Sequence, residues 1–472
     1  MRPAVKWIIS IGIPFIIFFI PASSFPIEGI TTIEVRVVAI FFLAALFWIL
    51  EPIPIYATSL LIILLELVFI SNKGLKFLIS SKGEGFGETL KYNEILGTFA
   101  SPIIILFLGG FFLAMAATKY RMDQNLAKVL LTPFGTRPRM VMLGLMLITA
   151  LFSMFMSNTA TTAMMLSILA PVLTVFEATD RGKIAFTLSI PVAANIGGIG
   201  TPIGTPPNAV ALKYLTGDYM ISFAEWMSFA VPFVIVLLLF GWILLGLLYP
   251  TSTSSIKLSI KGKWLRNSKA YLVYVTFALT ILLWLTDFVH GMNSYVVAMI
   301  PVAVFSMFGI INKQDLKNIS WDVLWLVSGG IALGLALDAS GLAERLINAI
   351  PFDTLPALLI IVAVTIVAMV MANFMSNTAT ANLLLPLVAA LGMSIDSLNK
   401  FGGAQMIILG VTFACSMGMA LPISTPPNAL AFGTGQIETK DMAKQGVIIA
   451  LVGLLLTYVL LYVMDLLNFF TL

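Results

Sequence analysis

The sequence predicts an all-α polytopic membrane protein, because apolar residues dominate its composition and recur in runs long enough to cross a bilayer. Of the 472 residues, 60% are hydrophobic and only 10% are charged, and the mean hydropathy is +1.03. Charged residues make up roughly a quarter of a soluble domain, so lipid rather than water is expected to surround most of this chain. The single cysteine excludes an intramolecular disulfide framework.

Apolar runs that contain a membrane crossing recur from one end of the chain to the other. A helix needs about 20 apolar residues to cross the hydrocarbon core. The eleven runs that meet this requirement lie near residues 7–24, 34–50, 53–70, 98–118, 184–216, 228–249, 271–290, 294–311, 321–340, 402–436 and 446–470. Two further segments, 139–176 and 355–391, are almost twice a normal span and carry Ser-Asn-Thr at the middle. We therefore predict 11 transmembrane helices and two re-entrant hairpins with polar tips.

The distribution of basic residues predicts the orientation of the chain. With the amino terminus in the cytoplasm and both hairpins returning to their side of entry, 18 of the 26 Lys and Arg residues fall on the cytoplasmic side. Cytoplasmic loops of membrane proteins hold such an excess. The carboxyl terminus is then expected to be extracytoplasmic, in a plasma or inner membrane. Because the basic residues occupy short loops, the net charge of +4 does not indicate a nucleic-acid partner.

Three motifs occur twice, 219 or 220 residues apart, and indicate an internal repeat. They are a glycine pair at 109–110 and 329–330, Ser-Asn-Thr-Ala-Thr at 157–161 and 376–380, and Thr-Pro-Pro-Asn-Ala at 205–209 and 425–429. In the predicted topology the helix with the first glycine pair runs inward and its copy runs outward, so the repeats are inverted. Inverted repeats place a substrate site at their interface, near the middle of the membrane.

Each Ser-Asn-Thr triplet is typical of a helix N-cap. Its side-chain oxygens suit the unpaired amides of a first helical turn, and the remaining amides and the positive end of the helix dipole attract an anion. A single triplet could equally cap a broken helix that has no ligand. Two triplets at equivalent positions of opposed repeats favour a paired receptor for an anion.

The Thr-Pro-Pro-Asn motifs predict that helices 184–216 and 402–436 are broken in the membrane. Proline removes an amide donor, and glycines beside both motifs loosen the same region. Unwound backbone at membrane depth must be buried in protein or line a wet cavity, and its free carbonyls are suitable ligands for Na⁺. A simple kink is the alternative, which the repetition of the motif disfavours.

The four motif segments carry no ionisable side chain, so neutral dipoles are expected to bind the anion. Three acidic residues in other apolar segments, Glu66, Asp287 and Asp338, lie near predicted helix ends, where solvation or local pairing is expected. No catalytic triad, phosphate loop or clustered metal-ligand set is present in the sequence. The sequence therefore predicts no enzymatic activity and no cofactor other than a possible Na⁺.

These paired motifs resemble the divalent-anion/sodium symporter family, whose members include dicarboxylate and citrate transporters. The resemblance covers essentially the whole chain and implies a homodimer in which each protomer has a scaffold and a transport domain that moves like an elevator. It implies four regions: N-terminal helices, mainly scaffold, over 1–97; a first repeat core over 98–249, with hairpin 139–176 and broken helix 184–216; a basic cytoplasmic loop and scaffold helices over 250–320; and a second repeat core over 321–472, with hairpin 355–391 and broken helix 402–436.

The resemblance also implies which residues bind substrate and sodium. Substrate carboxylates would touch Ser157, Asn158, Thr159, Thr205, Pro206, Ser376, Asn377, Thr378, Thr425 and Pro426. One sodium site would use Ser153, Ser157, Asn158 and Gly204, and the second would use Ala372, Met375, Asn377 and Ser424. Related symporters commonly carry Thr where Ala372 stands, so one hydroxyl ligand is missing here.

The sequence as a whole predicts a secondary active transporter of C4 or C5 dicarboxylates such as succinate, malate, fumarate or 2-oxoglutarate. Two opposed helix N-termini could each take one carboxylate. Citrate and sulfate are alternative substrates, and an anion channel is an alternative of another class. Sodium symport and dicarboxylate exchange both remain open, and Ala372 favours exchange because it removes a sodium ligand.

Overall fold

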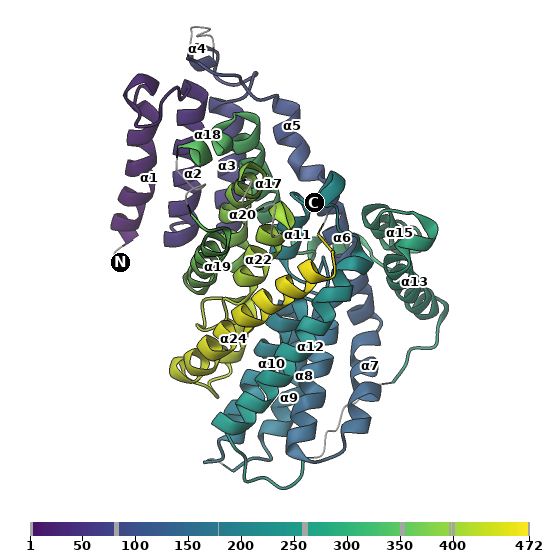
Figure 1. Ribbon diagram of the computed structural model, residues 1–472. Helices are drawn as coiled ribbons and strands as arrows, with labels where there is room; N and C mark the ends of the chain where they lie inside the picture. Colours follow the sequence, from purple (N-terminus) through teal and green to yellow (C-terminus); the bar gives the residue numbers. More distant parts are fainter. Residues whose placement is uncertain are drawn as a thin grey trace.

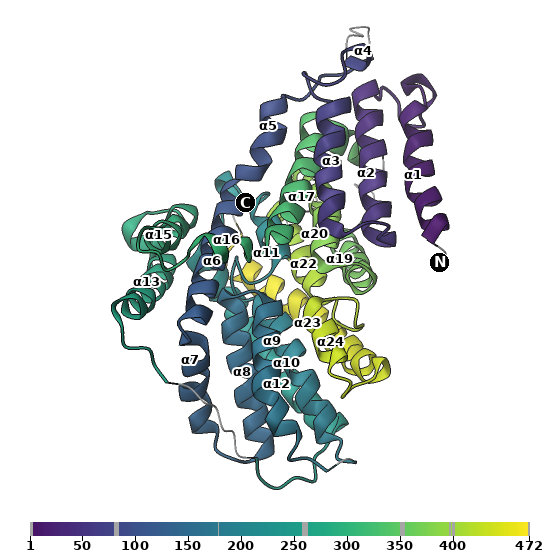
Figure 2. The ribbon, with the colours of Figure 1, turned by 180° about the vertical axis from the view of Figure 1, so that it is seen from behind.

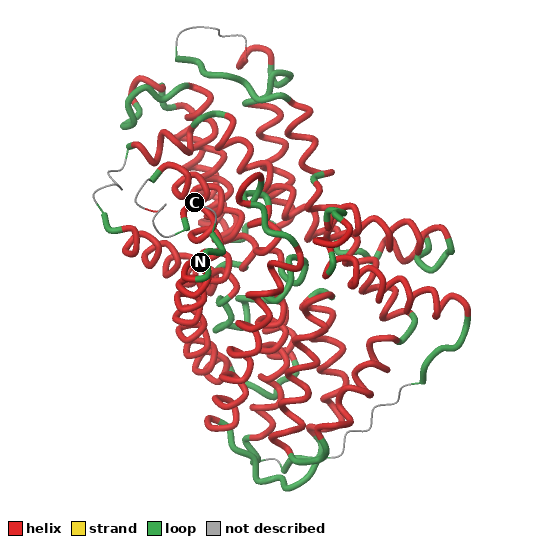
Figure 3. Tube along the Cα trace, turned by 45° about the vertical axis from the view of Figure 1, so that its right-hand side comes forward, coloured by secondary structure: helices red, strands yellow, loops and turns green. Residues whose placement is uncertain are grey.

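The computed structural model describes residues 3–79, 85–177, 179–256, 263–349, 355–395, 398 and 402–470. Residues 257–262 of the predicted basic loop therefore lie outside the described residues, as do 350–354, which precede the second predicted hairpin. Apart from one isolated bridge between Ser71 and Leu90, the described residues form helices joined by loops and turns (Figure 3). Eight helices in this part of the chain are long and apolar enough to cross a membrane. The prediction of an all-α polytopic membrane protein is confirmed.

The N-terminal helices stand side by side at one end of the molecule (Figures 1 and 2). They are α1 (Pro3–Phe19), α2 (Thr32–Leu50) and α3 (Ile55–Phe69), followed by the short α4 (Lys76–Ile79) and α5 (Tyr92–Gly97). Helix α2 begins with a capping box in which Thr31 and Glu34 satisfy each other's backbone amides. Glu34 also pairs with Arg345 at 2.7 Å, which fastens α2 to the second half of the chain.

The two predicted repeat cores share one order of helices. The first contains α6 (Pro102–Lys119), α7 (Met122–Leu131), α8 (Pro138–Phe155), α9 (Asn158–Leu173), α10 (Gly182–Gly198), α11 (Pro206–Leu212) and α12 (Phe223–Leu248). The second contains α17 (Trp321–Ala339), α18 (Leu342–Asn348), α19 (Ala357–Phe374), α20 (Asn377–Ser394), α22 (Gly403–Ser416), α23 (Pro426–Gly433) and α24 (Thr439–Leu466). Both predicted helix breaks are present, between α10 and α11 and between α22 and α23.

Helices α7 and α18 were not predicted from the sequence. Two residues separate each from the long helix before it, and the second of the two is left-handed, Arg121 at φ 57° and Gly341 at φ 77°. These two residues are 220 positions apart, so the repeat extends beyond the three motifs. Both helices are short and have polar faces, so neither contains a long apolar run.

The chain between the two cores adds four helices, of which α13 and α15 pack beside α6 (Figure 1). They are α13 (Ser268–Leu285), α14 (Asp287–His290), α15 (Ser294–Met307) and α16 (Lys313–Lys317). Helix α15 packs closely on α6 because Gly109 has no side chain: a Cβ there would lie 2.5 Å from the carbonyl oxygen of Ala298. Gly110 is less confined, since its Cβ would lie 3.4 Å from Ile203 Cδ1.

Glycines also let several elements approach α17. A Cβ at Gly329 would lie 2.3 Å from the Cβ of Ser59 on α3, and one at Gly330 would lie 2.0 Å from Asn382 Oδ1 on α20. Asn382 and Ser59 each donate a hydrogen bond to the carbonyl of Leu326, at 3.0 and 3.3 Å. Helix α17 is therefore held between the N-terminal helices and the second hairpin.

Asp180 joins the start of α10 to the segment after α12. Its carboxylate accepts hydrogen bonds from the amide of Gly182 (2.7 Å) and from the hydroxyls of Thr251 (2.8 Å), Ser252 (3.0 Å) and Thr253 (2.9 Å). Burial alone would raise the pKa of this loop carboxyl, but the hydrogen bonds outweigh burial and lower it to about 2. The group is therefore a charged anchor at any physiological pH.

Candidate functional site

Both Ser-Asn-Thr triplets form the turn of a helical hairpin. Ser157 and Ser376 are the N-caps of α9 and α20, and their hydroxyl oxygens accept hydrogen bonds from the amides of Ala160 (3.2 Å) and Ala379 (3.1 Å). The predicted caps are confirmed, but only the serine of each triplet makes this contact. The Asn and Thr side chains stand in the first turn of each helix and line the cavity described below.

The asparagine of each Thr-Pro-Pro-Asn motif holds the unwound backbone that precedes it. Asn208 Nδ2 donates to the carbonyls of Gly198, Ile199 and Thr201 at 3.2, 3.1 and 2.8 Å. Asn428 Nδ2 makes the equivalent contacts in the second half, with two carbonyls at 2.8 and 2.9 Å. Several carbonyls that we expected to be available to Na⁺ are therefore occupied by an amide, which is the physical reason for asparagine at the end of this motif.

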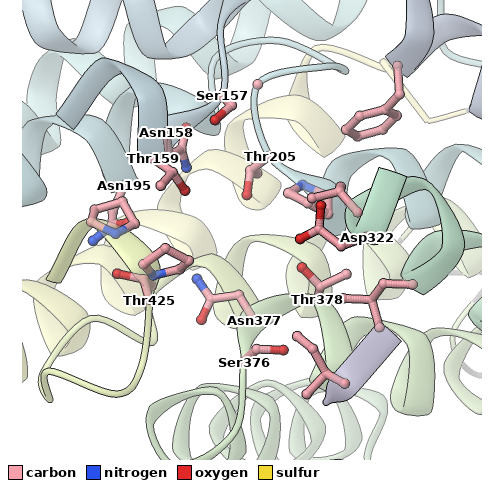
Figure 4. Close-up of a pocket in the computed structure, with 18 of the residues that line it drawn as sticks. Ser157, Asn158, Thr159, Asn195, Thr205, Asp322, Ser376, Asn377, Thr378 and Thr425 are labelled. Atoms are coloured by element: carbon pink, nitrogen blue, oxygen red, sulfur yellow. The ribbon is translucent and has the colours of Figure 1, made fainter. Parts of the chain in front are cut away.

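All ten residues predicted to bind substrate line one cavity of about 180 Å³ (Figure 4). The first turns of α9 and α11 reach it from one repeat and those of α20 and α23 from the other, so four helix starts face the same space. Drug-sized ligands occupy larger pockets, of roughly 300–1,000 Å³. The volume therefore fits a small ligand, and the free amides and dipoles at the starts of α9 and α20 favour an anion. Helices α11 and α23 each begin with two prolines, which have no amide hydrogen to donate.

The wall of this cavity that comes from α3 and α17 was not predicted. It includes Tyr56, Asp322 and Leu326. Among the described residues that line the cavity, Asp322 is the one with a charged side chain. Asp322 lies outside the repeated motifs, and nothing in the sequence indicates that the first turn of α17 lies opposite them.

A second cavity, of about 320 Å³, adjoins the first hairpin tip. It shares Phe111 and Ser157 with the main cavity and extends along α6 to Lys119 and to the segment 318–320. In the topology predicted from the sequence, this end of α6 lies on the cytoplasmic side. The two cavities together outline a route from the tips toward that end.

The first predicted sodium set is an oxygen-rich cluster. Ser153 Oγ donates to the carbonyl of Ala194 at 2.7 Å and also makes a close contact with Asn158 Oδ1. Gly204 lies against the same turn, because a Cβ there would be 2.4 Å from the carbonyl oxygen of Gly198. One hydroxyl proton is shared by two acceptors, so the cluster holds more oxygen lone pairs than donors and fits a hard cation.

The second predicted set has one oxygen fewer. The amide of Asn377 stands 3.1 Å from the carbonyls of both Cys415 and Gly418, to which it donates when its nitrogen faces them. With its oxygen facing them, three oxygens would converge as in a cation site. Ala372, at the position equivalent to Ser153, contributes no hydroxyl, and Ser424 already donates to the carbonyl of Asn373 at 2.8 Å. Met375 lies at the end of α19, with its own amide bonded within that helix.

Glu66 corrects one expectation from the sequence. It is fully buried in α3, and neither carboxylate oxygen accepts a hydrogen bond from the part of the chain that the structure describes. Solvation therefore does not apply to Glu66, whereas Asp338 is exposed as expected. Lys213, the residue directly after α11, interacts electrostatically with both carboxylates and donates to the carbonyl of Ile331 at 2.8 Å. This group links α11 to α3 and α17.

Over nearly its whole length, the chain is similar to known membrane transporters. A family model described as the sodium:sulfate symporter transmembrane region matches residues 2–467. A sodium-dependent dicarboxylate transporter of Staphylococcus saprophyticus is 31% identical over 491 aligned positions, which cover 95% of this chain and 89% of the relative. An inorganic phosphate transporter of Saccharomyces cerevisiae is 32% identical over 84% of this chain, which matches 43% of that longer protein.

Two solved structures share the fold at low sequence identity. The YdaH transporter of Alcanivorax borkumensis gives a TM-score of 0.54 at 14% identity and covers 78% of this chain and 86% of its own. MtrF of Neisseria gonorrhoeae gives a TM-score of 0.52 at 11% identity and covers 87% and 94%. At these identities the similarity concerns the arrangement of helices alone.

Proposed function

Because the chain belongs to the sodium:sulfate symporter family and is thus a secondary transporter rather than an enzyme, we propose that its substrates are C4 or C5 dicarboxylates. One observation carries the proposal: the N-terminal turns of α9 and α20, from opposite halves of the chain, face a single small cavity. Each turn offers free amides and polar side chains to one carboxylate. Succinate, malate, fumarate and 2-oxoglutarate have two such groups at suitable separation.

The substrate-binding role of the ten predicted residues belongs to this proposal. Their common position around the cavity supports it, and so does the name of the staphylococcal relative, a sodium-dependent dicarboxylate transporter. Citrate, sulfate and phosphate are the competing substrates, the last because of the yeast relative. Sulfate and phosphate have a single charged centre and would engage the two helix starts less evenly than a dicarboxylate.

We further propose that the two hairpins and the two broken helices move as one transport domain against a scaffold. In this arrangement the chain crosses the membrane eleven times, the hairpins are re-entrant, the repeats are inverted, and the protein is a homodimer with a cytoplasmic amino terminus. The cavity beside Ser157 and Lys119 opens toward the cytoplasm in that orientation. The structure then corresponds to an inward-facing state.

Uptake by liposomes that contain the purified protein tests the substrate. Liposomes preloaded with a dicarboxylate should accumulate labelled succinate or malate, and each of the four dicarboxylates should compete for uptake. Failure to take up any dicarboxylate, both under exchange and under a sodium gradient, would exclude the proposal. Saturable counterflow would separate a carrier from an anion channel, which requires no internal substrate.

The proposed coupling is dicarboxylate exchange, because the second sodium set has Ala372 where a threonine would supply a hydroxyl ligand. Uptake into preloaded liposomes should continue when choline replaces external Na⁺, and unloaded liposomes should take up little. An Ala372→Thr variant should gain sensitivity to Na⁺. A wild-type protein whose uptake rises steeply and sigmoidally with Na⁺ would instead be a symporter, and the exchange proposal would be wrong.

A further inference from the structure

A carboxylate faces the binding cavity from the side opposite the polar groups of the hairpin tips. Asp322 lies in the first turn of α17 and lines the cavity together with Tyr56 of α3. Figure 4 shows its oxygens directed into the space between Thr205 and Thr378. Thus the cavity that attracts an anion through neutral dipoles also presents one negative charge to it.

Asp322 is exposed, and its carboxylate neither pairs with a base nor accepts a hydrogen bond within the described ranges. An acidic residue in a first turn stabilises its own helix through the helix dipole, and this effect alone explains why an acidic residue can stand at position 322. That effect does not require the side chain to point into the cavity. Because the Asp322 side chain points into the cavity, its charge is available to a ligand.

The charge of Asp322 should affect anions differently according to which group they carry besides two carboxylates. If one carboxylate of a dicarboxylate lies at Asn158 and the other at Asn377, the carbon backbone lies between these two tips, in a cavity whose remaining lining includes Asp322. A hydrogen or hydroxyl on that backbone is compatible with a carboxylate, and a hydroxyl can donate a hydrogen bond to it. A third carboxylate would meet a like charge in a partly hydrated space.

We infer that Asp322 is a specificity-determining residue that excludes tricarboxylates and favours dicarboxylates with a hydroxyl group. The inference rests on the proposed transport of dicarboxylates, and it adds the basis on which substrates of this class are distinguished. It assigns selectivity to α17, outside the four repeated motif segments. Selectivity by charge would then reside on one wall of the cavity and carboxylate binding on the others.

The test is a comparison of citrate, L-malate and succinate as competitors of labelled succinate uptake at about pH 8, where citrate is a trianion. An Asp322→Asn variant keeps the size of the side chain and removes its charge. Inhibition by citrate, relative to succinate, should strengthen about tenfold in this variant, since like charges a few ångströms apart repel by an amount of this order. The preference for L-malate over succinate should decrease.

Two further variants separate this effect from a general disturbance. Asp322→Glu keeps the charge and should still discriminate against citrate, while Asp322→Ser provides a second neutral side chain. Glu344→Gln removes an exposed carboxylate from the first turn of α18, outside the cavity, and should leave the ratio of citrate to succinate unchanged. A ratio within twofold of wild type in both neutral variants would overturn the inference while leaving dicarboxylate transport intact. A wild-type protein that transports no dicarboxylate would overturn both.

Discussion

Replacing Asn208 by alanine should loosen the unwound segment that connects α10 to α11. Asn208 is fully buried, and its amide nitrogen has two hydrogens to share among the carbonyls of Gly198, Ile199 and Thr201. Ile199 also accepts a hydrogen bond from Trp226 Nε1 at 3.0 Å, and Thr201 accepts one from a nearby backbone amide, so these two carbonyls keep a partner. The loss is then two hydrogen bonds of about 1 kcal/mol each, plus about 1–3 kcal/mol for one buried carbonyl left unpaired, or roughly 3–5 kcal/mol in total.

The expected result is a lower unfolding temperature together with weaker transport. A change of this size should shift unfolding by several degrees, since 1 kcal/mol corresponds to about 2–4 °C in domains of 150–250 residues and to less in larger ones. Heating the detergent-purified protein and measuring the folded fraction by size-exclusion chromatography gives the shift, and succinate uptake gives the activity. Gln124→Ala, which removes an exposed amide from α7, is the control. An Asn208→Ala protein that unfolds at the wild-type temperature would show that the three contacts do not stabilise the break.

Three further sets of substitutions test other parts of the structure. Asn158→Ala and Asn377→Ala should each reduce dicarboxylate uptake at least tenfold without unfolding the protein, because the serine caps remain in place; wild-type uptake at equal expression would contradict their assignment. Gly109→Ala should destabilise the protein by about 1–3 kcal/mol, because its Cβ would lie 2.5 Å from a carbonyl oxygen of α15, whereas Gly110→Ala should be nearly neutral in the same thermal assay. Asp180→Asn should cost about 2 kcal/mol at neutral pH, because the pKa of Asp180 is lowered from 3.8 to about 2 in the folded protein. Its contribution is complete above about pH 4 and is lost as the pH falls through 2, so the unfolding temperatures of wild type and variant should converge in acid, and a constant difference would refute the cause.

The features that could be predicted from sequence are those determined by neighbouring residues. An N-cap requires a particular side chain and a free amide three residues later, so both triplets indicated where α9 and α20 begin. Two consecutive prolines interrupt a helix wherever it lies, so both breaks were expected near the observed positions. The inverted repeat then predicted that the two sets of motifs meet at one site, although the sequence contains no distances.

The features that could not be predicted depend on contacts between distant segments. Asp322 lies in an ordinary first turn, and only the packing of α17 beside the hairpins gives it a place in the cavity. Glu66 lies near the end of its helix, a position that usually allows solvation, but neighbouring helices bury it completely. The role of Asn208 was also missed, because the motif suggests a break but does not identify which side chain compensates the freed carbonyls.

The two copies of the glycine pair are used differently, and this asymmetry bears on how the protein moves. In the second copy, Gly330 admits Asn382 of the hairpin helix α20, which is fully buried against α17. The residue that corresponds to Asn382 in the first hairpin is Ala163, and it is exposed. A cavity rather than a packed helix lies beside α6 at the first tip. If the hairpins and broken helices move together between the two glycine-bearing helices, the structure has them packed against α17 and withdrawn from α6. Movement to the opposite state would then have to break the contacts of Asn382 and Lys213 with the carbonyls of α17, so these two side chains contribute to the barrier between the states.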